Sequence, residues 1–188
     1  EVFDVEVTRR QIDVKTVNYR MMDDNIGYIQ IEEFDEVTSD QFSQALDSLI
    51  EQGMEALVID IRNNPGGILD TVVAMLDELL PEGTIVSVKD RNGTAQEYTS
   101  DADTKLTVPL TVLINGNSAS ASEIFAGAIK DYGVGTLVGT TTYGKGIVQT
   151  AFSLSDGTGV KITIEDYYLP SGKSIHKVGV DPDVEIDL

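Results

Sequence analysis

The pattern of apolar positions predicts a series of β-strands along the chain. These segments either alternate apolar and polar residues or are apolar throughout, and they are rich in β-branched residues. They are residues 2–8, 26–31, 56–61, 84–90, 94–100, 110–114, 136–139, 146–154 and 160–169. The run ALVIDI at 56–61 is continuously apolar, which predicts a strand covered on both faces.

Three segments between the strands are predicted to be helices, at residues 39–53, 68–80 and about 120–131. Helices that alternate with strands indicate βαβ units and a layered α/β core, to which residues 84–100 add a β-hairpin. We expect one domain over residues 1–188. Residues 1–9 are a possible remnant strand from a domain upstream.

Composition and charge exclude several classes of function and partner. A chain of 188 residues with 41% hydrophobic and 24% charged residues is typical of one globular domain. Its net charge of −19 repels phosphate backbones, so nucleic acid is an unfavourable partner. There is no Cys, which excludes disulfides and thiolate nucleophiles. The single His, His176, lies in a polar, Gly-flanked stretch that predicts a solvated or hydrogen-bonded side chain.

Two loops between a predicted strand and a predicted helix are candidate sites, because α/β folds bind ligands at such strand ends. The first, RNNPGG at 62–67, has two glycines that can bring backbone N–H groups close to a ligand. The plain alternative is a tight turn. The second, NGNSASASE at 115–123, presents three serines at the start of a helix.

Ser120 has two interpretations. With Glu123 it matches a capping box, in which the serine only caps the helix. It is also placed as a nucleophile at a helix N-terminus, where the N–H of Ala121 could stabilise an oxyanion. The segment alone does not separate the two.

The stretch GTTTYGKGIVQT at 139–150 matches a phosphate-binding P-loop from Gly139 to Lys145, but Gly146 replaces the Ser or Thr that binds magnesium. A strand rather than a helix follows, so the P-loop interpretation fails. Lys145 is then either a surface lysine or a general base, since a Ser nucleophile can use a Lys amine in place of His. That role requires an uncharged amine, which burial favours, and Tyr143 and Ile147 are candidate apolar walls.

Together these segments resemble the C-terminal processing peptidases, also called tail-specific proteases, which use a Ser–Lys dyad. The resemblance rests on several motifs in order along nearly the whole chain. They are IGYIQIEEF, LVIDIRNNPGG, NGNSASASEIFAGAIKD, VGTTTYGKGIVQT, ITIEDYYLPSGKSIH and GVDPDVEI.

The resemblance implies a role for each matching residue. Ser120 is the nucleophile, Lys145 is the base, and Gln149 holds the lysine amine. Backbone N–H groups of Ala121 and Gly66 form the oxyanion hole, with Gly67 as the second choice. The resemblance also implies a fold similar to the ClpP/crotonase class, and no metal or organic cofactor.

The resemblance further implies a serine endopeptidase that acts on proteins with flexible or unfolded C-terminal regions, in the bacterial cell envelope or outside the cell. A PDZ domain is expected upstream in the full-length protein. The alternatives are a non-catalytic ligand- or peptide-binding module on the same fold and acyl-CoA chemistry, which the acidic charge disfavours.

Overall fold

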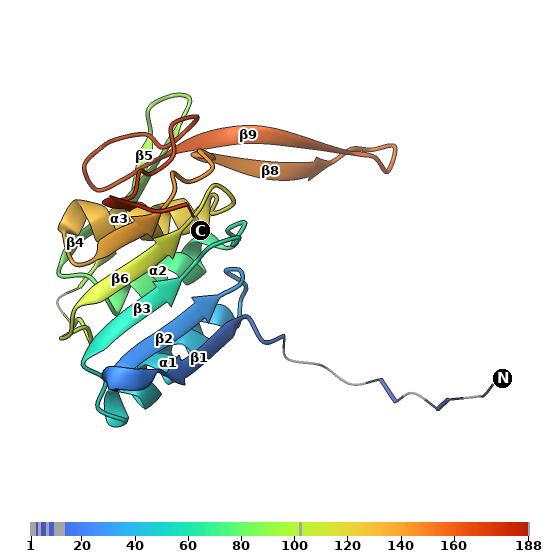
Figure 1. The fold of residues 1–188 in the computed structure, drawn as a ribbon. Helices are drawn as coiled ribbons and strands as arrows, with labels where there is room; N and C mark the ends of the chain where they lie inside the picture. The colour runs from blue at the N-terminus through green and yellow to red at the C-terminus, as the bar shows by residue number, and fades with distance from the viewer. Residues whose placement is uncertain (1–2, 4, 7, 10–13, 102, 188) are drawn as a thin grey trace.

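Two β-sheets enclose a layer of helices in the computed structural model of the chain, which describes residues 3, 5–6, 8–9, 14–101 and 103–187 (Figure 1). The larger sheet has the strand order β1-β2-β3-β6-β7-β10. Only β1 is antiparallel to its neighbour, and the other pairs are parallel. The strands are β1 (Val17–Met21), β2 (Ile26–Ile31), β3 (Ala56–Asp60), β6 (Leu110–Ile114), β7 (Thr136–Gly139) and β10 (Val184–Glu185).

The smaller sheet is antiparallel, with the order β5-β4-β9-β8. Its strands β8 and β9 continue beyond the body of the molecule as a two-stranded arm (Figure 1). The strands are β4 (Gly83–Asp90), β5 (Ala95–Ser100), β8 (Ile147–Ser153) and β9 (Gly159–Tyr168).

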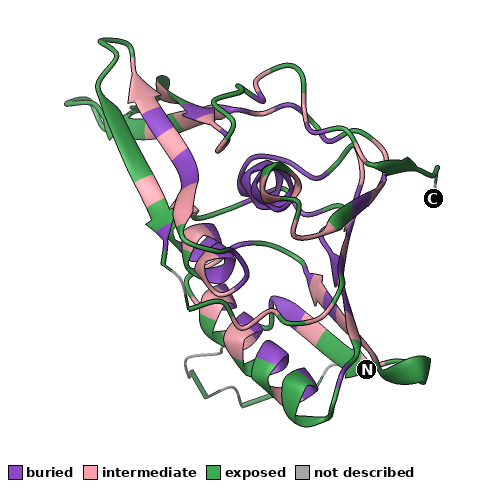
Figure 2. Ribbon diagram, turned by 90° about the vertical axis from the view of Figure 1, so that its left-hand side faces the viewer, coloured by how far each residue is buried: buried purple, intermediate pink, exposed green. Residues whose placement is uncertain are grey.

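Helices α2 and α3 pack against the smaller sheet, and α1 packs against β1, β2 and α2. A short 3-10 helix, η1, joins β1 to β2. Helix α3 contacts α2 as well as one strand of each sheet, β4 and β7. Residues 121–129 of α3 are all buried, and Figure 2 shows this helix as a purple coil at the centre of the molecule. The helices are η1 (Asp23–Asn25), α1 (Thr38–Glu51), α2 (Leu69–Asp77) and α3 (Ala121–Tyr132). Among the described residues, no helix is both long and apolar enough to span a bilayer.

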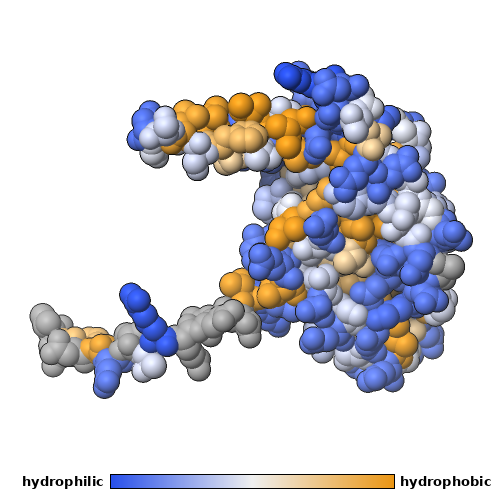
Figure 3. All heavy atoms as spheres, turned by 180° about the vertical axis from the view of Figure 1, so that it is seen from behind, coloured by the Kyte–Doolittle hydropathy of each residue, from blue (hydrophilic) through white to orange (hydrophobic). Residues whose placement is uncertain are grey.

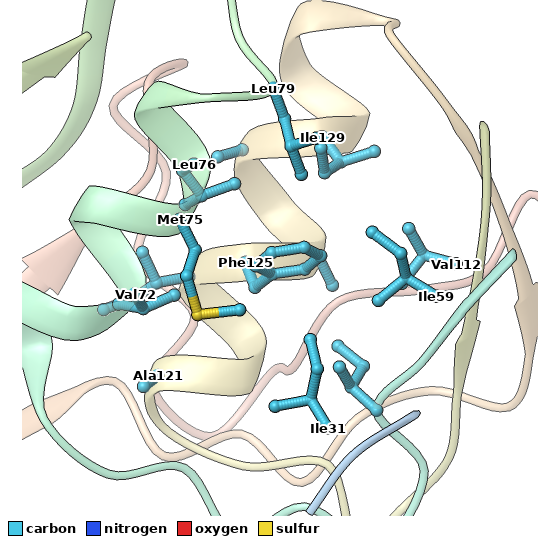
Figure 4. Close-up of a cluster of buried hydrophobic side chains, with 14 of the residues drawn as sticks. Ile31, Ile59, Val72, Met75, Leu76, Leu79, Val112, Ala121, Phe125 and Ile129 are labelled. Carbon is cyan, nitrogen blue, oxygen red and sulfur yellow. The ribbon is translucent and has the colours of Figure 1, made fainter. Parts of the chain in front are cut away.

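Phe125 of α3 lies in the middle of the apolar core. Figure 4 shows its ring between Met75 of α2 and Ile59 and Val112 of the larger sheet. All four side chains are fully buried. Burying one such side chain stabilises the fold by about 1.5–3 kcal/mol, so this packing fixes the position of α3 relative to the sheet.

The predicted α/β core with an added hairpin is confirmed, and three details of the prediction were wrong. Leu57 and Ile59 are buried but Val58 is half-buried, so β3 is not fully covered on both faces. Helix α2 ends at Asp77, before the predicted end at 80. Of the predicted strand 2–8, residues 3, 5–6 and 8 are in no strand, and residues 2, 4 and 7 lie outside the described residues.

Candidate active site

The loops that follow β3 and β6 are joined by buried hydrogen bonds at the carboxyl ends of these neighbouring parallel strands. The Ala119 N–H and the Ser122 hydroxyl both donate to the Asn64 carbonyl, each at 3.0 Å. The Ser118 hydroxyl donates to the Ile61 carbonyl at 2.8 Å. Ser118 and Ser122 are fully buried, so these two serines connect the loops rather than face a ligand.

Three asparagines also join the loop after β3 to the loop after β6, at the outer edge of their contact. The Asn63 side-chain oxygen accepts from the side-chain amides of Asn115 at 3.1 Å and Asn117 at 2.9 Å. The Asn115 side-chain oxygen in turn accepts from the backbone N–H of Asn63 at 3.0 Å and of Asn117 at 3.1 Å. The RNNPGG turn is therefore held against the serine loop from the rim as well as from the core.

Ser120 immediately precedes α3 in an unusual backbone conformation, with φ of 57° and ψ of −115°. Positive φ is costly for a residue with a side chain and is concentrated at functional sites. A Cβ on Gly66 would lie 2.8 Å from the Ser120 Cβ and 2.9 Å from the Ala121 nitrogen. Only glycine permits this approach, which places the RNNPGG turn directly beside Ser120, a residue that is 8% exposed.

Tyr167 of β9 also reaches Ser120. Burial raises the pKa of the Tyr167 phenol, and the nearby Ser120 side chain opposes that rise. The base of the β8–β9 arm is thus part of the same site. Sequence reasoning missed Tyr167 because the motif that contains it, ITIEDYYLPSGKSIH, was assigned no role in the site.

Glu123 connects Ser120 to the loop that carries Lys145. Its side chain has no exposed surface. One carboxylate oxygen accepts from the Thr142 hydroxyl at 2.6 Å and the Gly144 N–H at 2.7 Å. The other accepts from the Ser120 N–H at 2.9 Å and the Lys145 N–H at 2.7 Å. The last pair holds the backbones of the predicted nucleophile and base to a single oxygen atom, whereas the sequence indicated Glu123 only as a capping residue.

Lys145 itself is half-buried. Among the described residues, its amine has no hydrogen-bond or ion-pair partner. It lines an open pocket of about 550 Å³ together with Asn63, Pro65, Asn117, Ala119 and Tyr143. Tyr143, a predicted apolar wall, lines this pocket but is itself 68% exposed, so it covers little of the lysine in this conformation.

Gln149 does not hold the lysine amine in this conformation. It lies on β8 with an exposed side chain, and its amide donates to the Thr163 hydroxyl at 3.3 Å. The structure thus brings Ser120, Ala121 and Gly66 together and ties the Lys145 backbone to them, but it leaves the Gln149 side chain on the arm.

The backbone N–H groups beside Ser120 differ in their availability. The Gly66 N–H donates to the buried Asn64 side-chain oxygen at 2.9 Å. Neither the Ala121 N–H nor the Gly67 N–H has an acceptor among the described residues. These two donors are unengaged, whereas Gly66 supplies the close approach described above.

Gly146, which made the P-loop motif fail, has a packing role. A Cβ at this position would lie 2.6 Å from the His176 backbone nitrogen and 2.8 Å from an Ile175 side-chain carbon. His176 is half-buried, and its Nδ1 is buried with no hydrogen-bond partner in the described part of the chain. The predicted solvated or hydrogen-bonded imidazole is therefore wrong for that nitrogen.

A buried ion pair supports the start of the RNNPGG turn. Arg62 donates to both oxygens of Asp60, at 2.9 and 2.6 Å, and the Tyr28 hydroxyl donates to the second of them at 2.7 Å. Burial acts to raise the pKa of Asp60, but the hydrogen bonds from Arg62 and Tyr28 outweigh it and hold the pKa below its ordinary value. The carboxylate therefore stays charged and anchors the turn.

Comparison with known proteins shows the family of the chain. The model of peptidase family S41 matches residues 25–186. The chain belongs to peptidase family S41. A carboxyl-terminal-processing protease of Synechocystis sp. is 39% identical over 185 residues, which are 96% of this chain and 43% of the relative. The carboxy-terminal processing protease CtpA of Bacillus subtilis is 38% identical over 98% of this chain and 40% of its own length.

The solved structures agree with this assignment. A photosystem II D1 C-terminal processing protease superposes with a TM-score of 0.85 and 36% identity, over 96% of this chain and 50% of that protein. The predicted resemblance to the C-terminal processing peptidases is thus confirmed. The chain spans about two-fifths of the length of the two curated relatives named above.

Proposed function

We propose that this chain is the catalytic core of a serine endopeptidase that cleaves proteins near flexible or unfolded C-terminal regions. One observation carries the proposal. Ser120, which has a positive φ at the start of α3, and Lys145 donate their backbone N–H groups to the same buried carboxylate oxygen. The names of the S41 relatives support peptidase activity over the binding-module alternative.

In the proposed reaction, the uncharged Lys145 amine takes the proton of the Ser120 hydroxyl as its oxygen attacks the scissile carbonyl. The tetrahedral intermediate then expels the amine product, which receives the proton from the Lys145 ammonium. A water that gives its proton to the same lysine attacks the ester and releases the carboxyl product. This cycle regenerates the Ser120 hydroxyl without a metal or organic cofactor.

The oxyanion of that intermediate needs two N–H donors that are not already engaged. Ala121 provides one from the first turn of α3. For the second we favour Gly67 over Gly66, because the Gly66 N–H is already donated to Asn64. Gly66 remains necessary in the proposal because a side chain there would collide with Ser120.

Gln149 requires a rearrangement in this proposal. The Gln149 amide must leave the Thr163 hydroxyl and turn to the Lys145 amine. The side chains of Gln149 and Thr163 are both exposed on the arm, which permits that rotation. Bound substrate would also cover the half-buried lysine and exclude water from it.

The family assignment also motivates the proposed setting of this core. We place a PDZ domain upstream in the full-length protein, where it would capture the C-terminus of the substrate. We place the enzyme in the bacterial cell envelope or outside the cell. Proteins or peptides with flexible C-termini are the proposed substrates, and nucleic acid is not a partner.

The decisive experiment compares the chain with Ser120→Ala and Lys145→Ala on an unstructured polypeptide such as casein. Both variants should lose cleavage by at least about 1,000-fold, as loss of a nucleophile or its base does in related dyads and triads. Lys161→Ala, which removes an exposed lysine from the arm, is the matched control and should cleave normally.

Labelling with a fluorophosphonate isolates the first chemical step. The probe should modify Ser120 in the unaltered chain and react far more slowly in Lys145→Ala. Near-normal turnover by either variant would refute the dyad. Peptide binding without any labelling of Ser120 would instead favour the binding module.

A further inference from the structure

Strand β8 is an exposed sheet edge that lacks the usual protection against pairing. It follows β9 at the end of the order β5-β4-β9-β8, and no described strand pairs with its outer side. Edge strands are usually shielded by lysine, other charges or proline. The sequence of β8, IVQTAFS, contains none of these, although the chain carries 45 charged residues, 13 basic and 32 acidic. Such an edge is suited to pair with another extended backbone.

The register shows which backbone groups of β8 are free. The Leu154 N–H donates to the Thr158 carbonyl at 2.7 Å, which marks 154 and 158 as a hydrogen-bonded pair. Hydrogen-bonded and non-hydrogen-bonded pairs alternate along antiparallel strands, so the pairs 152–160 and 150–162 also point inward. The N–H and C=O groups of Gln149, Ala151 and Ser153 therefore point away from β9.

The free edge begins at the candidate active site. Lys145 precedes β8 by two residues, and the Tyr167 N–H of the paired strand donates to the carbonyl of Gly146, next to Lys145, at 2.9 Å. In Figure 1 the arm projects on the same side as the carboxyl ends of β3 and β6, with β8 nearer to them than β9. The open pocket beside Lys145 lies at the foot of this edge.

We propose that the substrate polypeptide binds as an added strand along the free edge of β8, in front of Ser120. This inference rests on the proposed peptidase function and specifies how that site holds its substrate. Backbone pairing recognises any extended chain, because the hydrogen bonds involve only main-chain groups. The mode fits a substrate whose target region is unfolded.

The side chains of the arm indicate which extended segments bind best. One face of the arm carries apolar side chains that are each more than a third exposed, and Figure 3 shows them gathered along the arm. They are Phe152, Leu154, Val160, Ile162 and Ile164. Alternate side chains of an added strand would lie beside this face. An apolar, extended segment is therefore the preferred occupant, and the position of the edge beside Ser120 favours a substrate over a second copy of the chain.

The first test blocks the edge without disturbing the arm. Ala151→Pro removes one outward N–H, and proline is tolerated at such a position because that N–H bonds no neighbouring strand. Cleavage of casein should fall about tenfold, since one backbone hydrogen bond and close approach are lost. Ala95→Pro is the matched control, because Ala95 is the exposed first residue of β5, the edge strand at the other end of the same sheet; cleavage should stay within about twofold of the parent. Fluorophosphonate labelling of Ser120 should be the same in all three.

The second test measures binding without catalysis. In Ser120→Ala, a ten-residue peptide of alternating Val and Thr should slow hydrogen exchange at the amides of Gln149, Ala151 and Ser153. If the peptide slows exchange in Ser120→Ala but no fluorophosphonate labels Ser120 in the unaltered chain, the docking mode is supported and the proposed peptidase activity is refuted. Labelling and cleavage with unchanged exchange, or equal cleavage by the Ala151→Pro and Ala95→Pro variants, would overturn the docking mode alone. If, in the absence of peptide, exchange at these three amides slows as the protein concentration rises, the edge binds a second copy of the chain. That result would also overturn the docking mode.

Discussion

Glu123 lies in the first turn of α3 with no exposed surface, although carboxylates are rarely fully buried unless they are paired. Its partners are one hydroxyl and three backbone N–H groups, from residues 120 and 142–145. This bonding satisfies the buried charge and determines the spacing between the segments of Ser120 and Lys145. At the scale of single residues, alignment of the site depends on a group that has no step in the proposed reaction.

Glu123→Gln should therefore impair the chemical step more than substrate binding. The substituted glutamine side chain has only one acceptor oxygen. Its NH2 group would face two of the four groups that donate to the Glu123 carboxylate, so the segments that carry Ser120 and Lys145 should shift. We expect the rate of Ser120 labelling by a fluorophosphonate to fall at least about tenfold, while KM for casein changes little. The exposed Glu82→Gln is the control. A fall in thermal stability with unchanged labelling would show that Glu123 is only structural.

Asp60 provides a prediction that depends on pH. Its folded pKa lies below the unfolded value of about 4, so the ion pair with Arg62 stabilises the fold above that pH. This stabilisation is lost as the pH falls through the folded pKa. Asp60→Asn should lower the free energy of unfolding by roughly 1–3 kcal/mol at pH 7 and by much less near pH 3.

Urea unfolding at both pH values measures this difference. Asp47→Asn is the matched control, because Asp47 pairs with Lys105 on the surface and such pairs contribute only about 0–1 kcal/mol. Equal effects of the two substitutions, or an effect of Asp60→Asn that does not change with pH, would contradict the prediction.

At the scale of elements, the sequence predicted most strands and helices because their apolar positions face one core. It missed β1 and β10 for physical reasons. Strand β1 is an edge strand in which only Val17 is buried, and β10 has two residues, both exposed. Neither has the alternation that indicates a strand.

The candidate site was predictable to the extent that its motifs are local. Ser120, Lys145 and the glycine turn lie in short, recognisable motifs, and the resemblance assigned their roles. The contacts of Glu123 with Thr142, Gly144 and Lys145, and the approach of Tyr167 to Ser120, depend on how distant segments meet in the fold. Periodicity does not encode such contacts. The proposed roles of the dyad and the oxyanion hole stay predictions until activity is measured.

Helix α3 links the core to the site, which gives a prediction at this scale. Phe125→Ala removes the central ring of the core and should lower the free energy of unfolding by about 3–5 kcal/mol. Because the same helix begins beside Ser120, labelling of Ser120 should also slow under conditions in which the variant is still folded. Ile50→Ala on the exposed side of α1 should change both quantities little. Urea unfolding measures the loss of stability, and the rate of fluorophosphonate labelling measures the effect on Ser120. Normal labelling in folded Phe125→Ala would show that the site does not depend on this core packing.

At the scale of the whole molecule, the net charge of −19 should influence which polypeptides reach the arm. A negative field attracts cationic chains and repels anionic ones, and added salt screens it over about 10 Å at 0.1 M. Two peptides with the same apolar core, one with a Lys-rich and one with a Glu-rich tail, should differ in KM severalfold at low salt. The Lys-rich peptide should have the lower KM, and the difference should shrink as salt is raised.

The values of kcat for the two peptides should remain similar, because the tails lie outside the site where the bond is cleaved. Steady-state kinetics from about 10 mM to 500 mM salt separate the two parameters. Since backbone pairing along β8 involves no charged group, kcat/KM for an uncharged peptide should vary little over the same range. A preference for the Lys-rich peptide that persists unchanged at high salt would point to a specific acidic subsite instead of the overall field.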